Sequence, residues 1–162
     1  MLTLAQLMDV VRHTIEVAEY CFIITHDGKG HANARLMQPF GPDEDMNIWF
    51  GTSAGSRKVQ EIQKYENVAL TFSHAGESAY VTMKGTASVT SDPEIKQRYW
   101  RTSFFDFWPE GSQSEGYAVI KFFPNHIEVM NFNKQVAPEP YGLKPAVLSR
   151  AGADWQIEYP NS

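Results

Sequence analysis

The sequence predicts a mostly β protein, a small antiparallel barrel with short peripheral helices, as one domain over residues 1–162. Three observations support this prediction. About six segments alternate apolar and polar residues as strands do. The helical stretches are few, so the repeated strand-helix alternation of a parallel sheet is absent. A length of 162 residues suits a single hydrophobic core.

The first element is an amphipathic helix in MLTLAQLMDVVRHTIEVAEY. Thr3 and Gln6 have the spacing of a capping box. Apolar residues then recur at helical spacing, namely Leu4, Leu7, Met8, Val11, Ile15 and Ala18. This pattern, which contains acidic residues, is not that of a signal peptide.

Two strand-like runs follow in YCFIITHDGKGHANARLMQPF, and the glycines of DGKG suit a hairpin turn between them. The period of two predicts that the second run places Ala32, Ala34 and Leu36 on one face and Asn33, Arg35 and Met37 on the other. Arg35 is therefore expected on the face that carries the polar groups.

The central segments alternate between strand and helix patterns. MNIWFGT is expected to be a strand, SRKVQEIQKYEN a short helix and NVALTFSH another strand. The long run SAYVTMKGTASVTSD alternates on both sides of Gly85. A glycine inside a strand indicates a bulge, a bend or a close backbone approach.

The last third begins with Asp92 and Pro93, an N-cap followed by proline at the first helical position. A short helix is expected to lead into the aromatic segment YWRTSFFDFWPEG. GYAVIKFFPNHIEVMNF is expected to form one strand or a strand pair around FPN. Residues 133–162 are expected to be an irregular C-terminal tail, in which AVLS is a candidate strand.

Composition excludes several classes of function. A net charge of −5 argues against a nucleic-acid binder, which needs a broad basic face. The single cysteine, Cys21, allows no intrachain disulfide and no four-cysteine zinc site; it is expected to be a buried small hydrophobe in an apolar strand. No apolar run reaches the ~20 residues that span a bilayer, so a cytoplasmic protein is expected.

The turn GTSAGSRK raises two chemical hypotheses, although it lacks the Gly-Lys-Ser/Thr of a Walker P-loop. Gly51, Ser53 and Gly55 match the G-x-S-x-G elbow of serine hydrolases. The partners would be Asp92 or Asp106 together with His126, in the chain order of that class. The parallel sheet that carries such an elbow is not predicted here.

The second hypothesis is a phosphate site. Arg57 and Lys58 lie in the first turn of the predicted helix, where the helix dipole disfavours cations. A phosphate would turn this repulsion into attraction, with hydroxyls from Thr52, Ser53 and Ser56 and backbone N–H groups close by. Arg35 could reach the same anion from the side. The alternative is that both cations point into water.

The blocks ARLM, FGTSAGSRKVQEIQKYENVALTF and AYVTMKGTASVTSDP closely resemble the FMN-binding split-barrel proteins related to pyridoxamine 5'-phosphate oxidase, especially the general stress protein 26 branch. The resemblance covers residues 4–132. It implies a homodimer with two FMN sites at the subunit interface. Related barrels also use deazaflavin F420 or haem as the cofactor.

By this resemblance the FMN phosphate would be held by Arg35, on the strand that also carries Leu36 and Met37, and by Ser56, Arg57 and Lys58. Gly51 and Thr52 would lie along the isoalloxazine ring and the ribityl chain. Tyr80 occupies a position where the oxidases use Gln to contact the flavin. Trp108, in an aromatic cluster with Trp100, Phe104, Phe105 and Phe107, would approach the flavin of the neighbouring subunit or serve as core and subunit contact.

The sequence also departs from the oxidases. Gly51 stands where they have Tyr, and Val129, Met130 and Asn131 replace a Tyr-Trp pair. The C-terminal PAVLSRAGADWQIEYPNS lacks their Arg- and His-bearing segment, so vitamin B6 oxidation is not expected.

Two classes of function remain open. One is a small-molecule oxidoreductase with NADH or NADPH as donor, and the other is a flavin-binding sensor or store without turnover. No catalytic residue is assigned. His26 and His31 flank a turn beside Asp27 and could bind a metal, but exposed turn histidines are commoner than ligands, and no metal site is predicted.

Overall fold

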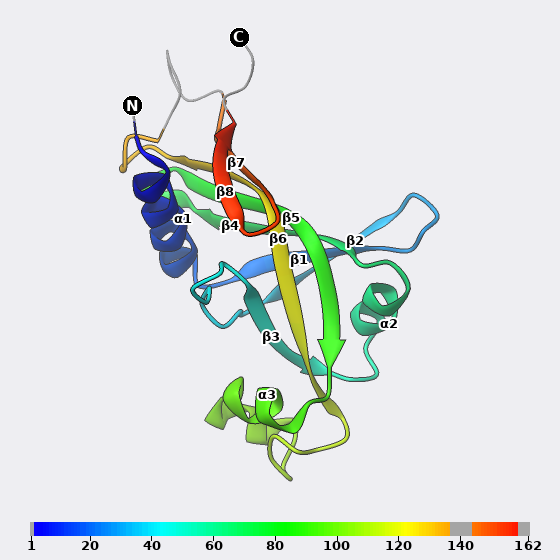
Figure 1. The fold of residues 1–162 in the computed structure, drawn as a ribbon. Coiled ribbons are helices and arrows are strands. Elements are labelled where there is room, and N and C mark those ends of the chain that lie inside the picture. The colour runs from blue at the N-terminus through cyan, green and yellow to red at the C-terminus, as the bar shows by residue number, and fades with distance from the viewer. Residues whose placement is uncertain (1, 137–143, 159–162) are drawn as a thin grey trace.

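The computed structural model describes residues 2–136 and 144–158, and within them eight strands form one antiparallel sheet. The strands follow the order β2 (Ala32–Met37), β1 (Cys21–His26), β4 (Asn67–His74), β5 (Ala79–Thr90), β6 (Tyr117–Asn131), β7 (Ala146–Ala151) and β8 (Asp154–Glu158), and β3 (Ile48–Ser53) pairs with β6 beside this path. Helix α1 (Leu4–Ala18) and the β7-β8 hairpin lie at one end of the molecule, and α3 (Pro93–Arg98) lies at the other (Figure 1). This is the mostly antiparallel split barrel that the sequence predicts.

Helix α1 (Leu4–Ala18) begins at the predicted capping box, because the Thr3 hydroxyl accepts from the Gln6 N–H and the Gln6 side chain accepts from the Thr3 N–H. Its buried face includes Leu7, Val11 and Ile15. These side chains join the main core, where α1 contacts β4, β5 and β6. The helix therefore closes one end of the barrel.

The predicted hairpin is formed by β1 (Cys21–His26) and β2 (Ala32–Met37), which pair in antiparallel register. Along β2 the residues Ala32, Ala34 and Leu36 are exposed, and Asn33, Arg35 and Met37 are partly buried. The predicted division of faces is confirmed. Arg35 consequently points toward the inside of the hairpin, where α2 (Arg57–Lys64) contacts β1.

Strand β3 (Ile48–Ser53) leads through the turn into α2, and β4 (Asn67–His74) returns to the sheet. A short 3₁₀ turn, Ala75–Glu77, precedes the long β5 (Ala79–Thr90). The register between β5 and β6 shifts at Gly85, where an added Cβ would lie 2.0 Å from the carbonyl oxygen of Phe123. Gly85 is thus a bulge with a close backbone approach, as predicted.

Helix α3 (Pro93–Arg98) starts at Asp92, whose carboxylate accepts from the N–H groups of Glu94 and Ile95. A 3₁₀ helix, Thr102–Asp106, follows within the aromatic segment. The next segment is a single strand, β6 (Tyr117–Asn131), that continues through FPN. Because β6 pairs with β5, β3 and β7, it joins the two halves of the barrel.

The prediction of an irregular C-terminal tail is corrected for the residues that the structure describes. β7 (Ala146–Ala151) contains the candidate strand AVLS, and β8 (Asp154–Glu158) pairs with it as a hairpin. Leu148 is buried, and Trp155 and Ile157 pack against the core. β7 pairs with the C-terminal half of β6, a contact that local sequence patterns do not indicate. Residues 137–143 and 159–162 of the predicted tail lie outside the described residues.

The barrel is open between β2 and β3. In the described part of the chain, β2 and β3 share no ladder of hydrogen bonds. One isolated bridge joins Phe40, which follows β2, to Trp49 of β3. Cys21 lies in the main core and is buried, as expected. Among the described helices, none has the length and hydropathy that a membrane crossing requires.

Candidate functional site

A pocket of about 660 Å³ lies where the ends of β2 and β3 diverge. β2 contributes Leu36 and Met37, β3 contributes the run from Gly51 to Ser53, and α2 contributes Lys58. Phe104, Phe107 and Trp108 form the opposite wall, and Tyr20 and Gln38 complete the lining. The structure therefore brings together six of the predicted site residues: Leu36, Met37, Gly51, Thr52, Lys58 and Trp108.

Gly51 allows the aromatic wall to approach β3. A Cβ at this position would lie 2.6 Å from Phe104 Cε2 and 2.7 Å from the hydroxyl oxygen of Tyr117. Both distances are well inside van der Waals contact, so a larger residue cannot be accommodated without movement of these rings. A glycine is therefore needed at position 51, because Phe104 and Tyr117 of the same chain occupy the space that a side chain would take.

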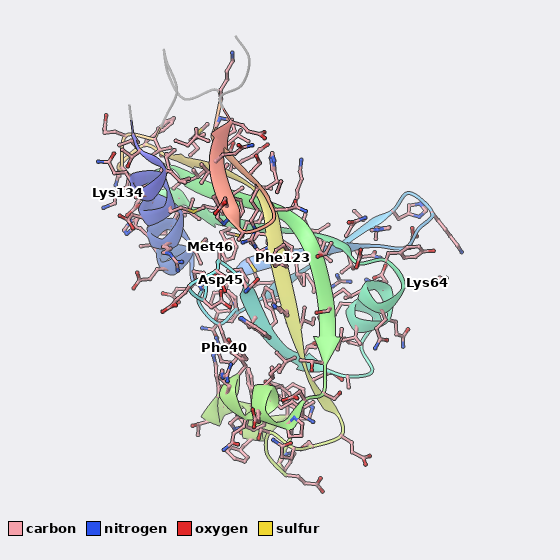
Figure 2. All side chains as sticks on the ribbon, in the orientation of Figure 1. Phe40, Asp45, Met46, Lys64, Phe123 and Lys134 are labelled. Atoms are coloured by element: carbon pink, nitrogen blue, oxygen red, sulfur yellow. The ribbon has the colours of Figure 1, made fainter. Side chains whose placement is uncertain are left out.

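The aromatic wall is a packed cluster that is built around Tyr117, which is fully buried. The rings of Trp100, Phe104 and Trp108 all contact Tyr117, with centroids 4.9 to 5.9 Å apart. The indole N–H of Trp108 donates to the carbonyl oxygen of Gly116 at 2.9 Å. The cluster lies at the end of the molecule near Phe40 (Figure 2). Trp108 thus lines the pocket of its own chain; the predicted contact with a neighbour's flavin stays a prediction.

The start of α2 contains an unsatisfied polar group. Ser56 is the N-cap residue, but its side chain makes no capping hydrogen bond. Its hydroxyl oxygen is buried and has no hydrogen-bond partner. Buried polar groups are rarely left without partners, because the lost hydration is not compensated. Ser56 therefore has free hydrogen-bonding capacity beside Arg57 and Lys58.

The two cations after Ser56 differ in environment. The ammonium group of Lys58 donates to the Thr52 hydroxyl at 2.9 Å. Burial, and then the positive charge of Arg35, lower the pKa of Lys58. The Arg57 side chain is 68% exposed, and its Nε lies 3.6 Å from a carboxylate oxygen of Glu61. Lys58 is thus held at the pocket, whereas Arg57 is free to reorient.

Arg35 lies behind the start of α2 and does not line the pocket. Its guanidinium donates to the Thr25 hydroxyl at 2.6 Å and to the Asn33 carbonyl at 2.9 Å. A third contact, at 3.4 Å, goes to Glu61. Burial lowers the pKa of Arg35, and the charge of Glu61 opposes that shift. Arg35 is thus fixed between the β1-β2 hairpin and α2.

Glu61 was not among the predicted site residues. Its carboxylate accepts from the Asn33 amide at 2.8 Å and from the Thr25 hydroxyl at 3.1 Å. Burial raises the pKa of Glu61, but these hydrogen bonds and the Arg35 charge outweigh it, and the pKa lies below its ordinary value. The spacing of four residues from Arg57 could have indicated their ion pair. The contact with Arg35 depends on the tertiary structure.

Tyr80 lies on β5, opposite Ser73 of β4 and Met130 of β6, and is not part of the pocket lining. Burial, and then the negative charge of Glu128, raise the pKa of its hydroxyl. The flavin contact of Tyr80 stays a prediction.

The serine hydrolase hypothesis fails on geometry. Ser53 pairs with Tyr117 at one end of β6, and His126 lies nine residues further along the same strand. At about 3.3 Å per residue the separation is roughly 30 Å. Asp92 caps α3, and His126 bonds instead to Glu128 at 3.0 Å. These residues cannot form a triad.

The turn histidines are also used locally. His31 bonds to Asp27 at 2.9 Å, and His26 accepts from the N–H of Gly28 at 3.2 Å. Over the described residues, no group of three or more His, Cys, Asp or Glu side chains is arranged to hold a metal ion.

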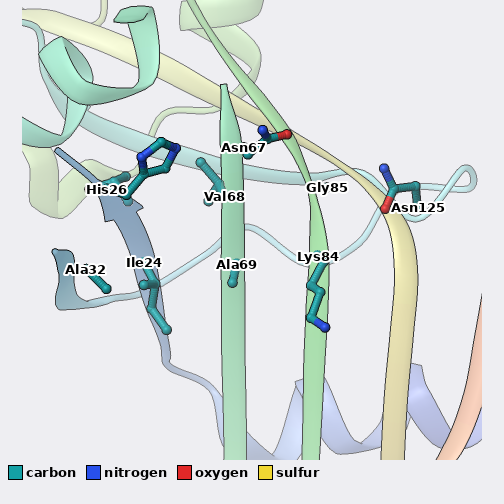
Figure 3. Close-up of a pocket in the computed structure, with 10 residues that line it drawn as sticks. Ile24, His26, Ala32, Asn67, Val68, Ala69, Lys84, Gly85 and Asn125 are labelled. Atoms are coloured by element: carbon teal, nitrogen blue, oxygen red, sulfur yellow. The ribbon is translucent and has the colours of Figure 1, made fainter. Parts of the chain in front are cut away.

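A second pocket, of about 430 Å³, lies on the sheet itself (Figure 3). Its lining comes from β1, β2, β4, β5 and the bend of β6, and includes Ile24, Ala32 and Ala69. Ile24 pairs with Ala34 in one direction and with Ala69 in the other. The lining also includes polar residues, among them Asn67, Lys84 and Asn125, and it contains none of the predicted site residues.

The fold and the site define a split-barrel protein with a cationic helix start beside an aromatic-walled pocket. The chain belongs to the family described as pyridoxamine 5'-phosphate oxidase like, whose model matches residues 6–144. No curated protein matches the sequence.

Solved structures of low sequence identity share the fold. General stress protein 26 from Bacillus anthracis is 22% identical, with a TM-score of 0.67 over 77% of this chain and 94% of that chain. A pyridoxamine 5'-phosphate oxidase-related, FMN binding protein from Nostoc punctiforme is 15% identical, with a TM-score of 0.76 over 95% and 96%. PhzG from Burkholderia lata, in complex with tetrahydrophenazine-1-carboxylic acid, is 14% identical, with a TM-score of 0.69 over 95% and 90%.

Proposed function

We propose that this chain binds FMN, with the phosphate at the start of α2 and the isoalloxazine ring in the aromatic-walled pocket. The observation that carries the proposal is the buried, unpartnered hydroxyl of Ser56 beside Lys58 at the helix start. A phosphate there would accept from Ser56, from the free backbone N–H groups of α2 and from Lys58. The FMN binding noted for the Nostoc punctiforme structure supports the same cofactor.

Each part of the pocket has a role in this proposal. Lys58, held by Thr52, would bind the phosphate at the pocket end, and exposed Arg57 would turn toward it. Met37, Phe104 and Trp108 would contact the flavin ring and exclude water from one of its faces. Arg35 would act mainly through its charge, since its guanidinium already donates to other groups.

The chemistry follows from the cofactor, because a bound flavin exchanges electrons while the protein binds and orients it. We propose a small-molecule oxidoreductase of the general stress protein 26 type, with NADH or NADPH as the donor, in the cytoplasm. Oxidation of pyridoxamine phosphate is not proposed, because the C-terminal residues of that activity are missing from the sequence.

The pocket lining is equally compatible with the alternative of a flavin-binding sensor or store without turnover. Among the described side chains that line the pocket, the carboxylate and imidazole groups that most often serve as acids or bases are absent, and Tyr20 and Lys58 carry its titratable groups. Lys58 already donates to Thr52. A site without a placed acid or base suits flavin binding as well as it suits hydride transfer.

A homodimer is part of the proposal, because the pocket opens onto an apolar surface. Tyr20 and Leu36 line the pocket and yet are 45% and 58% exposed. Phe22, 47% exposed, pairs with Leu36 in the β1-β2 ladder. A second copy that covers this surface would enclose the pocket and bring a further wall to the flavin.

The absorption spectrum of the purified protein, followed by titration with FMN and with riboflavin, tests the proposal. We expect flavin bands that are perturbed by the protein, and tighter binding of FMN than of riboflavin because only FMN carries the phosphate. Free FMN that stays unperturbed would contradict the proposal and leave F420 or haem to be tested. If FMN binds, its reduction by NADH or NADPH and reoxidation by an acceptor separate the enzyme from the store.

A further inference from the structure

Arg35, Arg57 and Lys58 form a cationic cluster near the proposed phosphate site, and Glu61 lies between Arg35 and Arg57. It is 9% exposed and receives hydrogen bonds from Asn33 and Thr25. The same carboxylate oxygen lies 3.4 Å from Arg35 Nη2 and 3.6 Å from Arg57 Nε. One carboxylate therefore connects β1, β2 and both arginines.

The cations of this cluster repel one another. The positive charge of Arg35 contributes to the lowered pKa of Lys58, after burial. The charge of Arg57 acts in the same direction on the pKa of Arg35, where burial is the largest cause and Glu61 opposes it. Without a counter-charge, three cations would be held together at an energetic cost.

The charge of the cluster suits a particular class of anion. Arg35, Arg57 and Lys58 with Glu61 leave an excess of two positive charges. A phosphate monoester carries about −1.5 to −2 at pH 7. The cluster with Glu61 is thus matched in charge to a terminal phosphate, and without Glu61 it would be overcharged.

Building on the proposed function, we infer that Glu61 is an internal counter-anion that stabilises the ligand-free site and sets its affinity for a terminal phosphate. It acts through Arg35 and Arg57 and is a positioning residue. Glu61 also lowers the affinity of the site for a phosphate, because its carboxylate repels the anion that the same arginines attract.

The primary test compares Glu61→Gln with the wild-type protein. Glutamine has the same shape and retains an oxygen that can accept from Thr25, but it removes the charge and one of the two oxygens that accept from Asn33. We expect the variant to bind FMN roughly three- to tenfold more tightly at low ionic strength, as expected for one partly screened charge. Riboflavin affinity should not change. The melting temperature of the ligand-free variant should fall, most at low salt.

Glu66→Gln is the matched control. Glu66 is exposed, lies just beyond the end of α2 and makes no side-chain hydrogen bond among the described contacts. The control alters the net charge of the protein by the same amount. It should leave the affinities for FMN and riboflavin and the melting temperature close to wild type.

A compensating pair covers the case in which Glu61→Gln does not fold without ligand. Arg57→Gln alone reduces the excess to one positive charge and should weaken FMN binding. Arg57→Gln combined with Glu61→Gln returns the excess to two and should regain most of the FMN affinity. A double variant that folds and binds FMN no better than Arg57→Gln would overturn the inference.

The outcomes separate the inference from the function on which it rests. If the wild-type protein does not bind FMN, both are wrong. If it binds FMN and Glu61→Gln has the FMN affinity of Glu66→Gln, only the inference is wrong. If Glu61→Gln weakens FMN and riboflavin alike, Glu61 is a structural residue without influence on phosphate, and the inference is again overturned.

Discussion

The ammonium nitrogen of Lys58 lies 2.9 Å from the hydroxyl oxygen of Thr52, and this hydrogen bond ties the first turn of α2 to the end of β3. Thr52 is buried, so the lysine is fixed over a pocket that both residues line. The cation is therefore held in place before any ligand arrives. Such preorganisation reduces the entropy that a bound anion must otherwise offset.

We predict that Lys58→Ala weakens the binding of FMN by about 1.5 to 3 kcal/mol, the range for a hydrogen bond to a charged group. Riboflavin, which lacks the phosphate, should bind almost as it does to the wild-type protein. Fluorescence titration with both ligands measures the difference. Lys64→Ala, at the far end of α2 (Figure 2), is the control. An equal effect of Lys58→Ala on both ligands would argue against a phosphate contact.

Gly51→Ala should destabilise the protein, because the new methyl group meets the rings of Phe104 and Tyr117. Overpacking of this kind costs about 1 to 3 kcal/mol. Gly55→Ala, four residues later, enters open space and is the control. Urea unfolding of both variants gives the comparison. Equal stabilities would mean that the aromatic wall adjusts without cost.

Leu36→Glu tests the proposed subunit interface. A carboxylate on the exposed face of β2 would be buried if a second copy covers this face, and an unpaired buried charge is strongly unfavourable. The variant should be monomeric in light scattering where the wild-type protein is dimeric. Phe132→Glu, at an exposed apolar residue just after β6, should remain a dimer. Dimeric Leu36→Glu would place the interface elsewhere.

Asp43 should make stability depend on acid pH. Burial raises its pKa, but hydrogen bonds from the Trp49 indole and from Asn47 outweigh this, and the net pKa is lowered from 3.8. A lowered folded-state pKa gives stability that is complete above the unfolded value and is lost as the pH falls through the folded value.

Asp43→Asn should therefore be less stable than the wild-type protein at pH 7, by about 1 to 3 kcal/mol. The difference in the free energy of unfolding between the two proteins should narrow as the pH falls below 3.8. Urea unfolding at several pH values measures it, with exposed Asp9→Asn as the control. A gap that is constant with pH would show that the charge of Asp43 is not responsible.

Cys21 should be inert in the folded protein. It is 1% exposed in β1, and burial raises the pKa of its thiol to about 12. Thiolate is the reactive form, so dithiobis(nitrobenzoate) at pH 8 should react with the unfolded chain and not with the native one. Rapid reaction under native conditions would indicate that β1 opens readily.

Sequence reasoning succeeds here where the signal is local. The capping box at Thr3, the bulge at Gly85 and the division of faces along β2 each depend on residues a few positions apart. Ser56, Arg57 and Lys58 are consecutive, so a helix start can be inferred from them directly. Their role in binding phosphate stays a prediction.

The features that sequence reasoning missed depend on distant partners. The hairpin of β7 and β8 pairs with the C-terminal half of β6, and no short-range sequence pattern predicts this pairing. Trp108 and Gly51 line the same pocket. Tyr117, whose ring contacts that of Trp108, lies beside Gly51 because β3 and β6 pair in one particular register. A change of register would move every such contact.

The sequence by itself determined the antiparallel barrel and the cationic start of α2, because strand periodicity and helix capping act over a few residues. Only the tertiary structure decided that the aromatic segment forms a wall of the pocket and that Glu61 lies between Arg35 and Arg57. The charge of the site arises from the packing of α2 against the β1-β2 hairpin, and its shape arises from the aromatic segment that packs against β3. Both join residues far apart in the chain.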